Sequence, residues 1–236
     1  MTQSALVTGA SSGIGAAVSN ALLDSGWEVY GIGRDFSACS LVHNPLFHAC
    51  SMDLTDTERL LEYADRLPKD GFRLLVNNAG AAWYGPHETL SPSMIQTMTR
   101  TNLEVPMILC GRLLRTLRQN KGMIINIASV TAITASPHGA VYGALKAGLV
   151  HFSRTLFEEN RKSGLRVSVI LPDISDTGLY RNADFGPSDD PEAVLQPEDT
   201  AEAVMMLVNQ REGTVISELV LRPQKHQIQR KNQNRQ

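Results

Sequence analysis

A glycine-rich turn near the N-terminus constrains the fold more than any other part of the chain. It follows the short apolar segment Ser4–Thr8, typical of a strand buried on both faces, and precedes a helical pattern that starts at Ala16. Gly9 favours a tight turn, Gly13 lets an anion approach the backbone, and Gly15 lets helix and strand pack closely. Free amides at the helix start would face that anion, so the turn predicts a pyrophosphate site.

The glycine spacing leaves a second interpretation open. It reads G-x-x-x-G-x-G rather than the G-x-G-x-x-G that is common in dinucleotide-binding proteins. A glycine-rich helix entrance can also serve close packing alone. Its position directly after the first strand favours the phosphate site.

Strand-like and helix-like segments alternate along the whole chain. Further strands are expected at residues 27–33, 46–50, 73–76, 123–128, 165–171 and 214–221. Helices are expected at residues 55–67, 94–117, 139–160 and 197–209. This alternation predicts a single-domain α/β protein, a three-layer Rossmann-like doubly wound parallel sheet of about seven strands.

Local signals refine this outline. Thr55 and Glu58 form a capping-box pattern, and Ser91 before Pro92 also marks a helix start. Pro106 predicts a kink or the start of a second helical segment. Two stretches are expected to be irregular: a clipped helix at residues 36–44 and a mobile, polar flap at residues 175–191.

The charge of the chain argues against strong electrostatic partners. Its 22 Lys and Arg residues against 24 Asp and Glu give a net charge of −2, so we expect no nucleic-acid and no membrane binding. The last residues differ, because four Lys and Arg residues stand among Gln and Asn there. We expect one domain over residues 1–224 and a basic polar tail over residues 225–236. The tail would be disordered or arm-like, with nucleic-acid binding as an alternative for it alone.

The cysteines and the apolar segments bear on location. Cys39, Cys50 and Cys110 lack metal-ligand and C-x-x-C spacing, so we expect reduced packing thiols and no metal site. No cationic segment followed by an apolar run opens the chain, and no apolar stretch reaches membrane-spanning length. A cytoplasmic protein is expected.

Tyr142 and Lys146 are the first candidates for chemistry. They are four residues apart in the expected helix 139–160, so they lie on one face, about 6 Å apart along its axis. A nearby ammonium favours phenolate and would lower the pKa of Tyr142, as general acid–base catalysis near neutral pH requires. A surface lysine beside a half-buried tyrosine is the alternative.

Arg34 and Asp35 stand at the end of the expected second strand. In doubly wound dinucleotide-binding folds, this position contacts the adenosine ribose. A carboxylate there binds the free 2′-hydroxyl of NAD, whereas a guanidinium accommodates the 2′-phosphate of NADP. Arg34 stands nearer the strand end, which favours NADP(H). Asp35 keeps NAD(H) as an alternative, and an exposed charge pair is the third interpretation.

The motif residues described so far form an ordered series with several further motif residues. The series is the glycine-rich turn, Asp53, Asn77-Asn78-Ala79-Gly80, Asn102, Ser129, Tyr142 with Lys146, and Pro172. In order and spacing the chain resembles the short-chain dehydrogenase/reductase family, in its single-domain form, over essentially its whole length. The resemblance implies an NAD(P)-dependent oxidoreductase that acts on CH–OH donors.

The resemblance assigns catalytic roles to four residues. Ser129 would hydrogen-bond the substrate oxygen, and Tyr142 would be the acid/base. Lys146 would bind the nicotinamide ribose and lower the pKa of Tyr142. Asn102 would hold a water that passes protons to Lys146.

The resemblance also implies a cofactor-binding set. Within it, Asp53 would hold the adenine amino group, the backbone of Ile174 the carboxamide, and Thr177 would lie near the nicotinamide and phosphates. The set is Thr8, Gly9, Ser11, Ser12, Gly13, Ile14, Gly15, Arg34, Asp53, Leu54, Asn78, Ala79, Gly80, Tyr142, Lys146, Pro172, Ile174 and Thr177.

One departure from the family pattern lies beside the expected substrate pocket. Asp173 follows Pro172 where the family usually has glycine, which puts the local backbone geometry in doubt. The candidate substrate residues are Trp83, His138, Asp173 and Arg181. Arg181 would grip a substrate carboxylate, as in a 3-hydroxy acid dehydrogenase. A solvated loop arginine and a loop histidine are the alternatives for Arg181 and His138.

The expected function is hydride transfer between NADP(H) and a small ketone, aldehyde, alcohol or hydroxy acid. The alternatives are a 3-oxoacyl-carrier reductase and a non-catalytic NADP(H)-sensing protein. An intact set of Ser129, Tyr142 and Lys146 disfavours the sensor, which needs no proton donor. The helices around residues 102–117 and 142–160 carry surplus apolar residues such as Met107, so a homodimer or homotetramer is expected.

Overall fold

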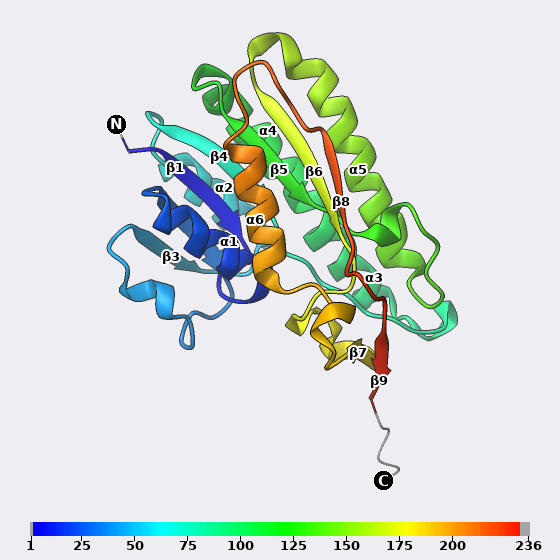
Figure 1. The fold of residues 1–236 in the computed structure, drawn as a ribbon. Coiled ribbons are helices and arrows are strands. Elements are labelled where there is room, and N and C mark those ends of the chain that lie inside the picture. Colours follow the sequence, from blue (N-terminus) through cyan, green and yellow to red (C-terminus); the bar gives the residue numbers. More distant parts are fainter. Residues whose placement is uncertain (1, 232–236) are drawn as a thin grey trace.

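The computed structural model describes residues 2–231 and shows a seven-stranded parallel sheet between two layers of helices (Figure 1). The strand order is β3-β2-β1-β4-β5-β6-β8, so the winding direction reverses between β1 and β4. Ligands of such sheets bind beyond the carboxyl ends of the strands at this reversal. The predicted fold class is therefore confirmed. The strands are β1 (Ser4–Thr8), β2 (Glu28–Gly33), β3 (Phe47–Ser51), β4 (Phe72–Asn77), β5 (Met123–Ile127), β6 (Arg166–Pro172) and β8 (Glu218–Leu221).

Alternating side chains of each central strand supply two cores. In β1, Ala5 and Val7 belong to the core beneath α1 (Gly13–Asp24) and α6 (Pro197–Val208). Leu6 points the other way, into the second core. The helices over that second face are α2 (Thr57–Arg66), α4 (Val105–Gln119) and α5 (Ala140–Asn160), while α3 (Pro92–Thr99) packs on α5. Figure 1 shows α1 and α6 together in front of the sheet.

The helix-start signals are partly confirmed. Ser91 caps α3 by accepting a hydrogen bond from the Met94 amide (3.3 Å). The capping box at Thr55 was the wrong assignment, because Asp56 caps α2 and the Thr55 hydroxyl donates to Asp53 (2.8 Å) instead. A carboxylate one residue later is the stronger cap, and the spacing pattern alone does not rank the two.

The remaining local predictions hold in outline. A π-helical turn, Arg100–Glu104, joins α3 to α4, and Pro106 lies in the first turn of α4, so a second helical segment starts there. The expected clipped helix reduces to a single 3-10 turn, Ser40–His43.

The flap, residues 175–191, has more structure than its composition predicts. It contains a 3-10 helix, Gly178–Asn182, and the short strand β7 (Phe185–Pro187). β7 pairs antiparallel with β9 (Ile228–Arg230), which comes from the basic tail. Disorder is therefore the wrong expectation for these tail residues, and the arm-like alternative describes them. Residues 232–236 of the tail lie outside the described part of the chain.

The structure can also be compared with the expectations for the cysteines and for membrane-spanning segments. Cys39 and Cys110 are buried and Cys50 is half-buried, and all three are free thiols. Within residues 2–231, no helix combines the length and the apolar character that crossing a membrane requires.

Candidate active site

The carboxyl ends of the sheet strands surround a cavity of about 330 Å³. Its lining comes from the turn after β1, the ends of β2 and β4, the residues after β3, β5 and β6, the N-terminal half of α5, and the flap. The predicted residues in this lining are Gly9, Ser11, Ser12, Gly13, Ile14, Arg34, Asp53, Leu54, Asn78, Ala79, Gly80, Trp83, Ser129, Tyr142, Lys146, Pro172, Asp173, Thr177 and Arg181. One cavity therefore joins the residues of the predicted phosphate turn to those of the predicted catalytic set.

The glycine-rich turn has the geometry of an anion cradle. Gly9 and Gly13 have φ angles of +69° and +53°, which side-chain-bearing residues rarely adopt. A Cβ on Gly15 would lie 2.1 Å from the Gly9 carbonyl oxygen, so only glycine lets α1 start this close to β1. The Ser12 side chain makes no cap hydrogen bond, which leaves the first amides of α1 directed at the cavity. The turn fits a dinucleotide pyrophosphate on these observations.

Thr8 supports the turn from behind. It is buried, and its hydroxyl accepts hydrogen bonds from the amides of Asn78 and Ala79, both at 3.0 Å. The Asn78 side chain donates to the Thr8 carbonyl oxygen (2.9 Å). Thr8 and Gly15 are thus predicted binding residues that shape the cavity without lining it.

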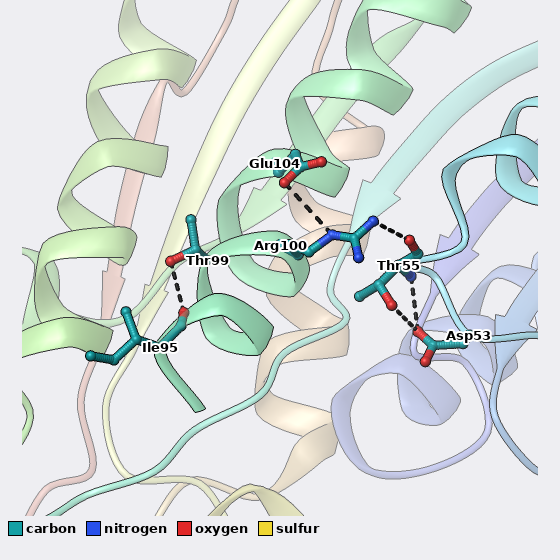
Figure 2. A network of polar contacts seen from close by, with 6 residues as sticks. All are labelled: Asp53, Thr55, Ile95, Thr99, Arg100 and Glu104. Carbon is teal, nitrogen blue, oxygen red and sulfur yellow. Dashed lines mark hydrogen bonds and ion pairs between the residues drawn. The ribbon is translucent and has the colours of Figure 1, made fainter. Parts of the chain in front are cut away.

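Asp53 organises the end of the cavity where the sequence predicts that adenosine binds. Its carboxylate accepts from the amide and hydroxyl of Thr55 (2.9 and 2.8 Å), and the hydrogen bond from that amide is the main cause that lowers the pKa of Asp53. Figure 2 shows the Arg100 guanidinium between Glu104 and the Thr55 carbonyl oxygen, to which it donates. The π-helical turn therefore holds the loop that presents Asp53.

Arg34 and Asp35 are separated by the structure. Arg34 is exposed and lines the cavity, whereas Asp35 lies outside the lining. The Asp35 carboxylate accepts from the Ser37 amide (2.8 Å), which lowers its pKa and turns it into the following loop. The charge that faces the cavity at the end of β2 is therefore positive.

Ser129, Tyr142 and Lys146 converge although they come from two elements. Ser129 follows β5, and its hydroxyl accepts from the Thr131 amide (3.2 Å). Tyr142 and Lys146 lie one turn apart on α5, buried to 4% and 3% exposure. The Lys146 ammonium lies 5.6 Å from the centre of the Tyr142 ring and donates to the Ile127 carbonyl oxygen (2.8 Å).

The predicted direction of the Tyr142 pKa is wrong for this arrangement. Burial raises the pKa of Tyr142, the neighbouring Tyr180 adds to the increase, and the hydrogen bond with Ser129 only opposes it. Burial also lowers the pKa of Lys146 to about 8. The spacing of the two residues fixed their common face but not the desolvation that outweighs their mutual effect.

Asn102 lies behind the cavity wall rather than in it. It is fully buried in the π-helical turn, and its side chain donates to the carbonyl oxygens of Ala81 (2.7 Å) and Met98 (2.9 Å). Its own side-chain oxygen accepts from the Ala81 amide (3.3 Å). Asn102 therefore fixes the chain that follows Gly80, and this contact comes with the break in helical geometry at residues 100–104.

Ile174 and His138 are predicted site residues that the cavity does not include. Ile174 is buried, its amide donates to the Asp173 carboxylate (2.8 Å), and its carbonyl oxygen accepts from Leu195 (2.9 Å). Both backbone groups expected to bind a carboxamide thus have partners, the first because aspartate replaces glycine. His138 is exposed, has a φ of +65°, and does not belong to the lining of the cavity.

Some lining residues escaped the sequence analysis. Thr97 and Thr101 face the cavity one turn apart, on α3 and the π-helical turn, and Thr55 lies beside Asp53. The spacing of the two threonines, four residues apart in an expected helix, was the available signal. The role of Arg100 had none, because its partner Thr55 is 45 residues away in the chain.

Comparisons with known proteins point to one family. The family model described as short chain dehydrogenase matches residues 3–185. Serine 3-dehydrogenase of Rhizobium radiobacter is 38% identical over 184 residues, which are 75% of this chain and 74% of that protein. A solved metagenomic short-chain oxidoreductase in complex with NADP is 30% identical, with a TM-score of 0.79 over 94% of this chain and 97% of that one. The closed form of a serine dehydrogenase complexed with NADP⁺ is 25% identical, with a TM-score of 0.84 over 99% and 100%.

Proposed function

Because the chain belongs to the short-chain dehydrogenase family and is thus an oxidoreductase, we propose that it interconverts a small alcohol and its carbonyl compound with NADP(H). The observation that carries this proposal is the single cavity lined by the glycine-rich turn and by Ser129, Tyr142 and Lys146. When bound, the cofactor supplies or accepts the hydride.

The protein contributes the proton and the hydrogen bonds. In carbonyl reduction, Tyr142 donates its proton to the substrate oxygen while Ser129 donates a hydrogen bond to the same atom. The high pKa that burial gives Tyr142 keeps it protonated for this role. Lys146, with a pKa of about 8, is mainly an ammonium at neutral pH and stabilises the phenolate left after proton transfer.

The preference for NADP(H) rests on Arg34. Its guanidinium is the charge at the end of β2 that lines the cavity, while the Asp35 carboxylate is engaged by Ser37 outside it. A guanidinium at this position suits a 2′-phosphate and a carboxylate suits a free 2′-hydroxyl. Two of the solved relatives carry NADP or NADP⁺ in their descriptions, which supports the same choice.

A small 3-hydroxy acid is the substrate class we favour. Arg181 lines the cavity from the flap and offers a guanidinium to a substrate carboxylate. Relatives described as serine 3-dehydrogenase and serine dehydrogenase support this class, because serine carries a carboxylate and a 3-hydroxyl group. Trp83 and Leu179 add apolar surface to the same cavity.

The test is turnover of NADP⁺ over a panel of serine, other 3-hydroxy acids and neutral alcohols of similar size. Tyr142→Phe is expected to lower kcat about 10³-fold while cofactor affinity stays within twofold, because the phenol ring remains and only the proton donor is lost. The matched control is Tyr63→Phe, because this tyrosine of α2 is partly buried against the core and does not line the cavity. Cofactor binding without turnover on the whole panel would contradict the proposal and favour the sensor.

We also propose that the chain forms a homodimer or homotetramer through α4 and α5. Met107 on α4 is 39% exposed, while Leu114, Phe152 and Phe157 are only partly covered by the core. Light scattering at micromolar concentration measures the mass, and a monomer would refute the association.

A further inference from the structure

Asp173 is a buried carboxylate at the edge of the cavity. It follows β6 directly, its side chain is 7% exposed, and one carboxylate oxygen accepts from the Ile174 amide (2.8 Å). A buried carboxylate is costly unless positive charge or further hydrogen bonds compensate it. The compensation must come from groups close to this position.

Within residues 2–231, the two basic side chains next to the Asp173 carboxylate both come from the C-terminal arm, which we define as residues 222–231. The Arg222 guanidinium lies 3.6 Å from one carboxylate oxygen and the His226 ring nitrogen 3.5 Å from the other. The side chains of Arg222 and His226 are 54% and 61% exposed, so they lie over the carboxylate from the solvent side. The arm thus covers the end of β6.

Beyond these residues, the arm binds the flap and the short segment after it. The Lys225 ammonium pairs with Glu192 (2.6 Å), and β9 pairs with β7. The Lys231 ammonium donates to the Tyr180 carbonyl oxygen (2.6 Å). Figure 1 shows β7 and β9 side by side beyond the carboxyl ends of the sheet strands.

The inner side of the same flap faces the chemistry. Leu179, Tyr180 and Arg181 line the cavity. The Tyr180 ring stacks on Tyr84, with ring centres 6.1 Å apart, and Tyr84 contacts the Tyr142 ring at 5.7 Å. The flap therefore lies between the arm and the predicted acid/base.

We propose that Asp173 is a positioning residue that anchors the C-terminal arm at the cavity edge, so that the arm holds the flap closed over the cofactor site. The charge of Asp173 fixes the start of the arm through Arg222 and His226, and the β7–β9 pairing transmits this restraint to the flap. A pairing of two three-residue strands is too short to be stable alone, so its order depends on contacts such as this anchor.

Amide hydrogen exchange of the full-length protein tests the anchor without substrate or cofactor. Asp173→Asn keeps the acceptor for the Ile174 amide and removes only the charge. Exchange of the β7 and β9 amides is expected to accelerate about five- to tenfold, while β5 amides stay unchanged, since only local opening is affected. Arg222→Gln removes one of the two exposed partners, so folding should be unaffected, and it is expected to give a similar acceleration. In the double variant, the exchange rates of the β7 and β9 amides should exceed those of either single variant by no more than twofold, because both substitutions break the same contact.

Asp65→Asn is the matched control, because it removes an equivalent charge from an exposed pair with Arg112 far from the arm. In Asp65→Asn, the exchange rates of the β7 and β9 amides are expected to equal those of the unaltered protein. Rates within twofold of the unaltered protein in both Arg222→Gln and Asp173→Asn overturn the anchor, as does full additivity of the two substitutions.

The kinetic consequence rests on the proposed function and is measured separately. Arg222→Gln should raise the Kd of NADP⁺ and the substrate KM about three- to fivefold and change kcat less than twofold, because the flap is loosened but the proton donor is untouched. A fall in kcat with unchanged Kd and KM would overturn this part. The exchange result stands even for a protein that turns over no substrate, so failure of the anchor and failure of the proposed function remain distinguishable.

Discussion

The two walls of the cavity are held in place by different forces. The sheet wall, formed by residues that follow β1, β2, β4 and β5 and by the start of α5, rests on fully buried strands and on hydrogen bonds such as those that main-chain amides donate to the Thr8 hydroxyl. The flap wall, formed by residues 177–181, rests on 3-10 turns, aromatic contacts and the pairing of two three-residue strands. Ion pairs with exposed lysine and arginine side chains complete its support.

This difference indicates a division of tasks between the walls. Buried backbone networks tolerate little change, which suits the constant parts of a cofactor and a proton donor. Short, solvent-exposed elements open locally at low free energy and accept new side chains, which suits substrate entry and substrate choice. Substitutions in the sheet wall should therefore affect folding and cofactor binding most, and substitutions of side chains that the flap wall turns to the cavity should affect substrate constants most.

Among the substitutions that compare the two walls, Gly15→Ala is expected to have the largest effect. The added Cβ would meet the Gly9 carbonyl oxygen, a backbone atom that cannot move alone, so the free energy of unfolding should fall by about 3 kcal/mol. Urea unfolding measures it. Gly111→Ala in α4 is the matched control, because no atom lies within 4 Å of its Cβ, and it should be neutral or stabilising. Equal effects of the two substitutions would show that the turn is not closely packed.

The second expectation concerns pH and Lys146. Burial lowers its pKa from 10.5 to about 8, so between these values the unfolded chain binds more protons than the folded one. The free energy of unfolding should therefore rise as pH increases from 8 towards 10, by on the order of 2 kcal/mol, and the penalty is fully present below pH 8. Above pH 10 the raised pKa of Tyr142 acts in the opposite direction.

Lys146→Met should remove this rise, whereas Lys162→Met, at an exposed position after α5, should keep it. Urea unfolding of the three proteins at pH 7.5, 8.5 and 9.5 gives the comparison. A rise of equal size in Lys146→Met would mean that the ammonium is not desolvated in the sheet wall.

Arg34→Gln tests the cofactor end of the sheet wall. Loss of the guanidinium should raise the Kd of NADP⁺ about tenfold and leave that of NAD⁺ unchanged, because only the former carries a 2′-phosphate. Fluorescence titration with both dinucleotides measures the ratio. Arg115→Gln, which removes an exposed arginine on α4, should leave both constants alone, and an equal loss for both dinucleotides in Arg34→Gln would argue against 2′-phosphate recognition.

The smallest effect is expected in the flap wall. Arg181→Ala should raise KM for a 3-hydroxy acid about fivefold and leave KM for a neutral alcohol and kcat unchanged, because one charge-assisted contact is lost. In Arg181→Lys, KM for the 3-hydroxy acid should lie between that of the unaltered protein and that of Arg181→Ala, since lysine keeps the charge without the planar guanidinium. Equal changes for acidic and neutral substrates would remove carboxylate recognition from the flap.

Much of the sheet wall could be read from local sequence. The run from Thr8 to Gly15 carries its own geometry, because positive φ angles and close approach restrict those positions to glycine. The common face of Tyr142 and Lys146 follows from helical periodicity. These properties depend on neighbours within about one helical turn in the chain.

The flap wall could be read only in part. Its position after β6 and the candidate Arg181 were visible, but the order of the flap depends on β9, more than 40 residues further on. The arm looked disordered because its composition is polar, and its partners Asp173 and Glu192 are distant in sequence. The pKa values of Tyr142 and Lys146 were likewise hidden, because desolvation is set by the packing of the whole site.

By itself, the sequence determined the winding of the sheet, the geometry of the glycine-rich turn and the common helical face of Tyr142 and Lys146. Each of these follows from backbone sterics or from a fixed periodicity. Only the tertiary structure decided that Asn102 holds the chain after Gly80, that Asp173 accepts a hydrogen bond from the Ile174 amide, and that β9 of the arm pairs with β7 of the flap. Those contacts depend on how the folded chain positions the residues involved, and local sequence patterns do not specify that positioning.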